Sequence, residues 1–543
     1  MTTNHQHRDW LLLTLATLAC LLPFSTKAFH MDDPLFLWSA QQIVHHPWNP
    51  YGFDLVWYFI RMPMWAVTKN PPLTCYYAAL IGSIAGWSEL VMHLAFLLPA
   101  VALVLGTYQL ARRFTRHPLL AAAITLAAPV VIVSATSVMC DTMMLALWVW
   151  ASLFWIEGLD ASSRWRLLLS AILVSACALT KYFGASLLPL LLIYSLVHRR
   201  RLEKRLFYLL IPVAVLVQYQ LWTINLYGHA LLSDAIRYTF NENTAQTGLL
   251  AQLLIGLSFA GGCTLPVVFF APWLGNRKSL IAALSAAAFA ALLVHLHWIS
   301  ISSEFTLAHP VEVHLQFALF IFGGICLLAL ALRDLWQSRN APALFLALWI
   351  AGTFFFATLI NWTVNARSIL PLVPAAAILI ARRLQSLEVT PARIAAPLAL
   401  SFLFSLWITC GDAGFANSAR QAAFMIHQRT DGQTGTLWFA GHWGFQYYME
   451  QLGAQPYDQK TNLARPGETL IMPQNNSNLF AVPPGLITET IDIPMPRGVT
   501  TSRGTSGAGF YSSVWGPLPF SFGPVPSETY NFIRLPQQPV GLH

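Results

Sequence analysis

The sequence predicts a mainly α-helical, polytopic transmembrane bundle with a small mixed α/β domain at its C-terminal end. Of the 543 residues, 56% are hydrophobic and only 10% are charged, whereas about 25% of an average soluble domain is charged. Long apolar segments recur up to residue 410, and the sequence after it is rich in Pro, Gly, Asn and Gln. A bilayer is therefore the expected solvent for residues 1–410.

The apolar segments are long enough to cross a membrane. A spanning helix needs about 20 mainly apolar residues, and by this criterion the sequence predicts about 13 spans. Their expected cores are 10–28, 88–111, 118–139, 142–159, 167–180, 183–197, 206–227, 249–273, 279–298, 313–332, 341–360, 368–381 and 394–410. An odd number of spans places the two ends of the chain on opposite sides of the membrane.

Basic residues indicate which side each loop faces. The formal net charge of +8 arises largely from clusters in alternate loops, such as those at 112–116, 199–205 and 382–393. Lys and Arg are enriched in cytoplasmic loops, so these loops and the N-terminus are expected in the cytoplasm. Membrane topology thus explains the basic charge, and no nucleic-acid partner is expected.

Two long segments fall on the extracytoplasmic side. Residues 29–87 form the first, and its apolar, Trp-rich pieces Leu35–Val44 and Leu55–Val67 are too short to cross. Each is expected to be a helix lying in the membrane interface. Residues 411–543 form the second segment, which completes a predicted division into a transmembrane domain and a soluble extracytoplasmic domain.

The soluble domain is expected to be small and mixed in structure. Short runs rich in apolar residues at Thr436–Ala440 and Thr469–Met472 are typical of strands. Its end is expected to be loosely ordered, and the glycine-rich stretch Gly504–Gly509 is expected to be a flexible turn because it lacks the strand-to-helix setting of a phosphate loop.

Acidic residues occupy the first two outer turns. Asp32 and Asp33 follow the first apolar segment, and Asp141 lies between the next pair of outer span ends. Asp33 before Pro34 is typical of a helix N-cap, and Asp141 is also compatible with capping. The functional interpretation is a general base that takes a proton from an acceptor hydroxyl at the membrane surface. The two roles are compatible with each other.

Basic residues occupy two other outer turns, against the general charge bias. Lys181 precedes Tyr182, and Arg367 ends the stretch that begins at Asn361. Snorkelling from a helix end or anchoring in the interface is the alternative explanation. Together with the acidic residues, these cations suit an anionic lipid phosphate that leaves as a nucleophile is deprotonated.

At these residues the chain resembles the GT-C superfamily of glycosyltransferases, especially the branch of protein O-mannosyltransferases and the lipid A aminoarabinose transferase. The motifs that carry the resemblance are Met31-Asp32-Asp33-Pro34, Asn70-Pro71-Pro72-Leu73, Asp141, Thr180-Lys181-Tyr182, Asn365-Ala366-Arg367 and Leu370-Pro371-Leu372-Val373-Pro374. The resemblance covers residues 1–410 by order and spacing and reaches the remainder only by analogy.

The resemblance implies a membrane-embedded, inverting glycosyltransferase. Such an enzyme moves a sugar from a polyprenyl-phosphate donor to an extracytoplasmic acceptor, which is a protein, a lipid or a glycan. By the same resemblance, Asp33 or Asp32 is the base and Asp141 is a supporting acid. The pair is Asp-Asp where Asp-Glu is common, which leaves open which carboxylate acts. Relatives of this kind suggest the bacterial inner membrane as the location.

The resemblance also implies ligands for the donor and a loop for the acceptor. Lys181, Arg367 and Tyr182 are the implied ligands of the donor phosphate. The implied loop residues are Asn70, Pro71 and Pro72. Asn70 stands where relatives often have His before the two prolines, which weakens an acceptor or metal role inferred there.

No metal-ligand set is expected from the spacing of the residues. His295 and His297 lie two positions apart, so they do not share a helix face, and the outer loop at 304–314 has ligand types without a recognised spacing. Some relatives use a divalent cation and others do not, so a cation remains open and no cofactor is predicted.

The alternative function is that of a polytopic transporter or lipid flippase. Such proteins place ionisable groups near the membrane midplane and often contain internal repeats. In this sequence the charges collect at span ends and no internal repeat is found. The pattern favours an enzyme, although a catalytically silent relative that acts as a scaffold would have the same pattern.

Overall fold

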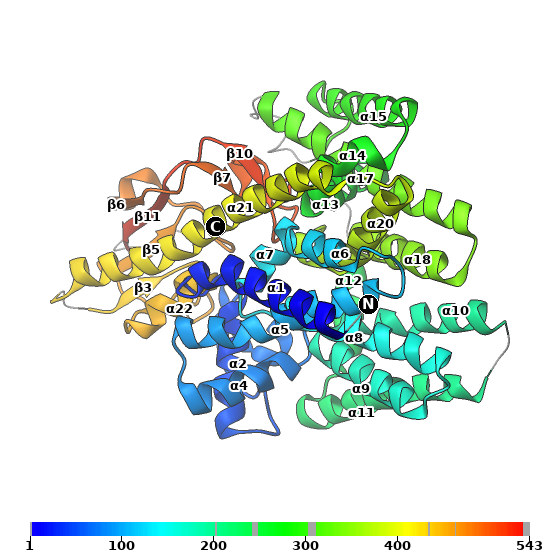
Figure 1. Ribbon diagram of the computed structural model, residues 1–543. Coiled ribbons are helices and arrows are strands. Elements are labelled where there is room, and N and C mark those ends of the chain that lie inside the picture. Colours follow the sequence, from blue (N-terminus) through cyan, green and yellow to red (C-terminus); the bar gives the residue numbers. More distant parts are fainter. Residues whose placement is uncertain are drawn as a thin grey trace.

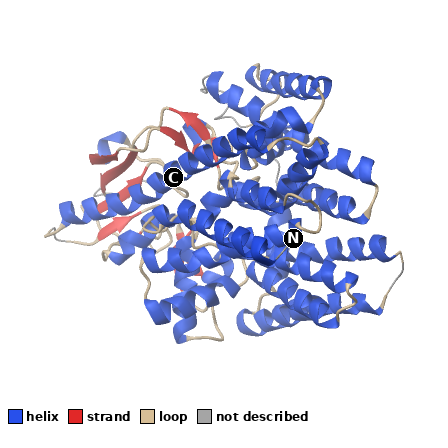
Figure 2. Ribbon diagram, in the orientation of Figure 1, coloured by secondary structure: helices blue, strands red, loops and turns tan. Residues whose placement is uncertain are grey.

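The fold is a helical bundle that extends into a small β-rich region. The computed structural model describes residues 3–200, 203–241, 248–301, 311–432, 435–461 and 463–535. Figures 1 and 2 show that the strands gather at one end of the molecule, beside the long helix α21 (Pro391–Thr430). The predicted fold class is therefore confirmed.

Nine of the described helical segments are long and apolar enough to cross a membrane. They are α5 (Glu89–Ala111), α8 (Cys140–Asp160), η2 (Tyr182–Ser186) with α10 (Leu187–Arg199), η3 (Lys204–Leu209) with α11 (Leu210–Tyr227), α15 (Arg277–His295), α17 (Val311–Ser338), α18 (Ala341–Phe355) with the π-helical turn η4 (Phe356–Ile360), α19 (Ala366–Ile369) with η5 (Leu370–Leu372) and α20 (Val373–Ser386), and α21. The chain is thus a multi-pass membrane protein.

Two bent helix pairs raise the number of candidate spans to 11. α6 (Pro118–Leu126) and α7 (Pro129–Ala135) meet at 64°, and α13 (Leu249–Cys263) and α14 (Pro266–Leu274) meet at 94°. A proline opens the second helix of each pair. Proline has no N–H and clashes with the preceding turn, so a helix usually ends before it.

The two other predicted spans also coincide with helices. α1 (Thr3–Leu21), followed by the single turn η1 (Leu22–Phe24), covers most of the segment expected at 10–28, and α9 (Arg164–Thr180) covers the one expected at 167–180. α9 has only 17 residues, and the first turns of α1 are polar. Each predicted segment is therefore helical, while length and composition support 9 to 11 spans among the described residues.

The first outer segment combines helices with a β-hairpin. Its elements are α2 (Asp33–His45), β1 (Asp54–Trp57), β2 (Ile60–Pro63), α3 (Met64–Val67) and α4 (Leu73–Ala85). α2 agrees with the helix expected at 35–44. The helix expected at 55–67 is wrong over most of its length, because Tyr58 and Phe59 have φ values of 49° and 69° and turn β1 back onto β2. Two-residue hairpin turns of type I′ need positive φ at both central residues.

The β-rich region contains one mixed sheet of five strands in the order β4-β3-β5-β11-β6. Its elements are β3 (Leu437–Phe439), α22 (Trp443–Gln451), β4 (Gln455–Pro456), β5 (Thr469–Pro473), η6 (Pro484–Leu486), β6 (Ile487–Ile493) and β11 (Glu528–Arg534). The expected strands near 436–440 and 469–472 are β3 and β5. Ala422 and Ile426 of α21 share a buried core with Phe439, Ile471 and Phe532, so the helix covers one face of the sheet.

α21 continues through the domain boundary expected between residues 410 and 411. Its 40 residues would extend about 60 Å at a rise of 1.5 Å per residue, about twice the thickness of a hydrocarbon core. The helix is therefore longer than one membrane crossing requires, and Figure 1 shows that it runs on to the sheet. The sheet and the bundle are joined by a continuous helix rather than by a flexible linker.

Residues 498–523 fold back onto the bundle instead of being loosely ordered. We call residues 498–523 the return segment; it contains β7 (Gly498–Thr500), β8 (Ser502–Arg503), η7 (Gly504–Ser506), β9 (Ala508–Gly509) and β10 (Ser521–Gly523). Its side chains Phe510, Leu518 and Phe520 are buried in the same core as the membrane helices. After it, β11 occupies an inner position of the sheet, so the expectations of a flexible glycine turn and a loose end are wrong up to residue 535.

The contact between the first outer segment and α22 leaves no space for a side chain at Gly444. A Cβ atom there would lie 2.0 Å from the carbonyl oxygen of Phe29. We expect Gly444→Ala to destabilise the protein by about 1–3 kcal/mol, because the backbone must shift to accommodate the methyl group. The melting temperature of the purified protein in detergent measures this effect. Gly485→Ala, whose Cβ meets nothing within 4 Å, is the control, and equal melting temperatures in the two variants would contradict the packing.

Candidate active site

A cavity of about 450 Å³ collects charged side chains from turns far apart in the sequence. Its volume lies within the usual range of ligand sites, about 300–1,000 Å³. The predicted site residues that line it are Asp32, Asn70, Asp141, Lys181, Tyr182 and Arg367. We call this space the charged cavity. The structure therefore brings most of the predicted residues together.

Lys181 and Asp141 form an ion pair in one wall of the charged cavity. α9 ends at Thr180 because the backbone of Lys181 is extended, with φ −151° and ψ 133°. The Lys181 Nζ donates to Asp141 Oδ1 over 2.6 Å. Asp141 lies in the first turn of α8, where the helix dipole favours a negative charge. An ammonium group has three N–H donors, so Lys181 can bind this carboxylate and a second anion together.

Arg367 and Asp32 form the second ion pair of the charged cavity. Arg367 Nη1 donates to Asp32 Oδ2 over 2.8 Å. Arg367 is held by the short helix α19, whose N-cap Asn365 accepts a hydrogen bond from the backbone N–H of Ser368. Asp32 occupies the N-cap position of α2 without making a side-chain capping bond. Its carboxylate is therefore available to the arginine.

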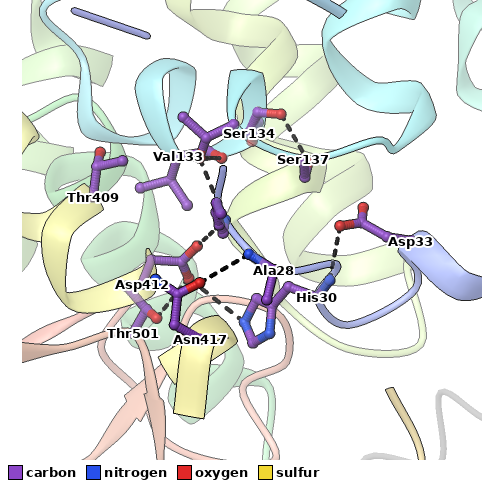
Figure 3. A network of polar contacts seen from close by, with 12 residues as sticks. Ala28, His30, Asp33, Val133, Ser134, Ser137, Thr409, Asp412, Asn417 and Thr501 are labelled. Atoms are coloured by element: carbon purple, nitrogen blue, oxygen red, sulfur yellow. Dashed lines mark hydrogen bonds and ion pairs between the residues drawn. The ribbon is translucent and has the colours of Figure 1, made fainter. Parts of the chain in front are cut away.

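Asp33 lies behind the cavity wall rather than in it. Its side chain is fully buried, and its two oxygens accept the backbone N–H groups of His30 and Val138, each at 2.8 Å. Figure 3 shows the carboxylate beside His30. Burial raises the pKa of Asp33 to about 7, although nearby Lys27 lowers it. The capping role expected for Asp33 is wrong, since α2 begins at this residue and its side chain binds elsewhere.

The predicted loop residues Asn70, Pro71 and Pro72 are divided between the cavity and the core. Asn70 lines the charged cavity, and its carbonyl oxygen accepts the Tyr51 hydroxyl at 2.8 Å. Pro71 and Pro72 are buried just before α4 and do not line the cavity. Tyr182 also lines it, with its hydroxyl 3.0 Å from that of Tyr219.

Part of the cavity wall consists of residues that the motifs do not include. Lys69 lines the cavity; its Nζ donates to the Ala66 carbonyl over 2.6 Å and lies 4.9 Å from the ring centroid of Tyr238. Tyr238 belongs to α12 (Leu231–Asn241), which forms another wall with residues such as Ile236. α12 carries apolar residues at helical spacing on one face, the pattern of an amphipathic helix, and this signal could have predicted it.

A buried polar cluster, which no sequence pattern predicts, lies next to the charged cavity. Lys27 Nζ contacts Asp412 Oδ2 at 2.6 Å, and both side chains are 0% exposed. Thr501 Oγ1 donates to Asp412 Oδ1 over 2.7 Å, and the Tyr511 hydroxyl donates to the same oxygen over 3.0 Å. Figure 3 shows Asp412 between Thr501 and His30. The cluster joins the end of the first helical segment, α21 and the return segment.

No metal centre is found among the described residues, because none of their His, Cys, Asp and Glu side chains form a group of three or more that could hold an ion. The ring of His295 packs edge-on against that of His314, with centroids 4.8 Å apart. Most of the outer loop considered for metal binding, residues 302–310, lies outside the described part of the chain.

Comparisons with known proteins match part of the chain. Residues 69–222 match the family model for dolichyl-phosphate-mannose-protein mannosyltransferase, a stretch that contains Asn70, Asp141 and Lys181. This match supports the resemblance that the motifs indicate. No curated protein sequence matches the chain.

Two solved structures of ArnT from Cupriavidus metallidurans are similar to this chain. The structure bound to undecaprenyl phosphate has a TM-score of 0.44 and 16% identity, covering 87% of this chain and 94% of that one. The apo structure has a TM-score of 0.44 and 18% identity, covering 86% and 93%.

The buried position of Asp141 predicts non-additive effects on stability. Its side chain is 2% exposed and that of Lys181 is 21% exposed. Lys181→Met leaves the carboxylate without its cation, so we expect a clear drop in melting temperature. The double variant Asp141→Asn/Lys181→Met removes both charges, and we expect it to be more stable than Lys181→Met alone, by about 1–3 kcal/mol.

The control for this double-variant experiment is the Arg113–Asp160 pair, whose side chains are 41% and 30% exposed. Exposed pairs contribute about 0–1 kcal/mol, so Arg113→Met should change the melting temperature little. Simple additivity of the substitutions at Asp141 and Lys181 would contradict a coupled pair in the cavity wall.

Proposed function

We propose that this protein is a membrane-embedded, inverting glycosyltransferase that moves a sugar from a polyprenyl-phosphate carrier to an extracytoplasmic acceptor. The observation that carries the proposal is the charged cavity, in which the Asp32–Arg367 and Asp141–Lys181 pairs face one space. The family-model match over residues 69–222 supports a donor of the lipid-phosphate class. The acceptor is a protein, a lipid or a glycan.

Lys181 and Arg367 are the proposed ligands of the donor phosphate. Lys181 follows the last residue of α9, and Arg367 lies in the first turn of a long apolar segment. Cations at helix ends allow a phosphate to sit at the membrane surface while its polyprenyl chain stays among the lipids. Guanidinium and ammonium groups both form strong, charge-assisted hydrogen bonds with phosphate oxygens.

Asp32 is the proposed base, because it lines the cavity and Asp33 does not. A phosphate that binds Arg367 competes with Asp32 for the guanidinium group. The displaced carboxylate oxygen can then accept the proton of an acceptor hydroxyl. Asp141 is proposed to hold Lys181 in place.

The proposed reaction is a single displacement at the anomeric carbon. The acceptor oxygen forms a bond to this carbon and loses its proton to Asp32, while the bond between the carbon and the phosphate oxygen breaks. The negative charge that develops on the leaving phosphate is stabilised by Lys181 and Arg367. Attack from the side opposite the phosphate inverts the configuration of the sugar.

We propose that the charged cavity faces the extracytoplasmic side of a bacterial inner membrane and that the N-terminus lies in the cytoplasm. Arg367, near the start of the α19–α20 span, lines the charged cavity. The other end of that span carries Arg382 and Arg383, which line a separate polar cavity with Arg333. Clusters of arginine at that end fit a cytoplasmic face.

The two neighbouring aspartates provide a direct test of this mechanism. We expect Asp32→Asn to lower kcat by about 10²- to 10⁴-fold, the usual contribution of a general base, without weakening donor binding, because Asp32 competes with the phosphate for Arg367. We expect Asp33→Asn to lower the melting temperature, because it disturbs two buried backbone contacts, but to keep most of the activity per folded molecule. Transfer from a panel of radiolabelled polyprenyl-phosphate sugars by the protein in lipid nanodiscs measures both.

Two results would go against this mechanism. If Asp33→Asn is inactive at normal stability while Asp32→Asn is active, the assignment of the base is wrong. If the parent protein transfers no sugar from any donor, the proposed glycosyltransferase activity fails, and transport becomes the leading alternative.

A further inference from the structure

The return segment binds the backbone immediately before the arginine of the charged cavity. The N–H of Ala366 donates to the carbonyl oxygen of Phe510 over 2.8 Å, and the N–H of Ser513 donates to that of Val364 over 2.8 Å. The hydroxyls of Thr363 and Ser513 lie 2.9 Å apart. The start of α19 is thus fixed by residues that come much later in the chain.

The side chain of Tyr511 lies between the arginine and the buried polar cluster. The Arg367 Cζ is 5.7 Å from the centroid of the Tyr511 ring, within the range of a cation–π contact. The hydroxyl donates to Asp412 Oδ1 over 3.0 Å, and the ring of His30 packs edge-on at 5.3 Å. Burial holds the pKa of the Tyr511 hydroxyl well above its ordinary value, so this group remains a hydrogen-bond donor.

Asp412 is itself firmly held. It is paired with Lys27, and both side chains are fully buried. It also accepts the hydroxyl of Thr501, which belongs to the return segment. A buried carboxylate with this many partners has little freedom to move, because losing one partner leaves a charge uncompensated. The ring of Tyr511 is therefore fixed in front of Arg367.

We infer that Tyr511 is a positioning residue for Arg367 and that the return segment thereby completes the phosphate side of the donor site. The inference rests on the proposed function, in which Arg367 binds the donor phosphate. A guanidinium group held against a ring face has a defined plane, and bidentate binding of a phosphate requires such a plane. The C-terminal region thus acts on the donor as well as covering the membrane domain.

The test is the binding of undecaprenyl phosphate to the purified full-length protein in nanodiscs. Tyr511→Leu removes the ring, and we expect binding to weaken about 5- to 30-fold, the effect of losing a largely desolvated cation–π contact of about 1–2 kcal/mol. Tyr511→Phe keeps the ring and loses only the hydroxyl, so its affinity should stay within about 3-fold of the parent. If Tyr511→Leu does not fold, Tyr511→Met replaces it, because its flexible chain fills the space without a π face.

A second measurement separates positioning from a general loss of structure. In the transfer assay, the KM for the donor should rise in Tyr511→Leu, while the KM for the acceptor stays unchanged. The control is Tyr530→Leu, which removes a buried tyrosine whose hydroxyl lies 3.5 Å from Ser418 Oγ in the sheet core; it should leave donor binding unchanged.

The outcomes distinguish this inference from the proposed function. If the parent does not bind undecaprenyl phosphate, the proposed donor is wrong and the inference falls with it. If the parent binds and Tyr511→Leu binds equally well, the positioning role of Tyr511 is overturned while the proposed function stands. Equal weakening in Tyr530→Leu would also overturn it, because the effect would then be one of stability.

Discussion

The buried ion pair between Lys27 and Asp412 is the contact on which the arrangement of the site depends. Removing two charges from water carries a desolvation penalty of several kcal/mol per ion, which only close pairing and further hydrogen bonds offset. Here the Lys27 Nζ lies 2.6 Å from Asp412 Oδ2, and the hydroxyls of Thr501 and Tyr511 donate further hydrogen bonds to the carboxylate. Lys27 shortly precedes Asp32 in the chain, so the pair also fixes the segment that brings this carboxylate to the cavity.

Much of the site could be predicted from the sequence because it sits at span ends. Hydropathy gives the ends of the helices, and a charge at such a position is costly unless it is paired or functional. This pattern predicts Asp141, Lys181 and Arg367 as site residues. The choice between Asp32 and Asp33 could not be made, because it depends on an N–H group of Val138, which is distant in sequence and leaves no local signal.

The parts that could not be predicted depend on tertiary packing. The hairpin turn at Tyr58 and Phe59 lacks the Asn and Gly that normally mark positive φ, so the sequence favoured a helix there. The return segment has the Gly and Ser content of a flexible linker. Gly509 and Gly516 are instead required by close packing, since a Cβ on Gly516 would lie 2.1 Å from the carbonyl carbon of Gly507.

The ion pair between Asp32 and Arg367 has a consequence for turnover. Under the proposed function, Arg367 gives up Asp32, its partner at 2.8 Å in the free protein, when it binds the carrier phosphate, whereas Lys181 keeps Asp141. Once Asp32 has passed on the proton that it accepted, its carboxylate competes with the spent phosphate for the guanidinium group. Re-formation of this internal pair therefore opposes product inhibition and favours return of the carrier lipid to the bilayer.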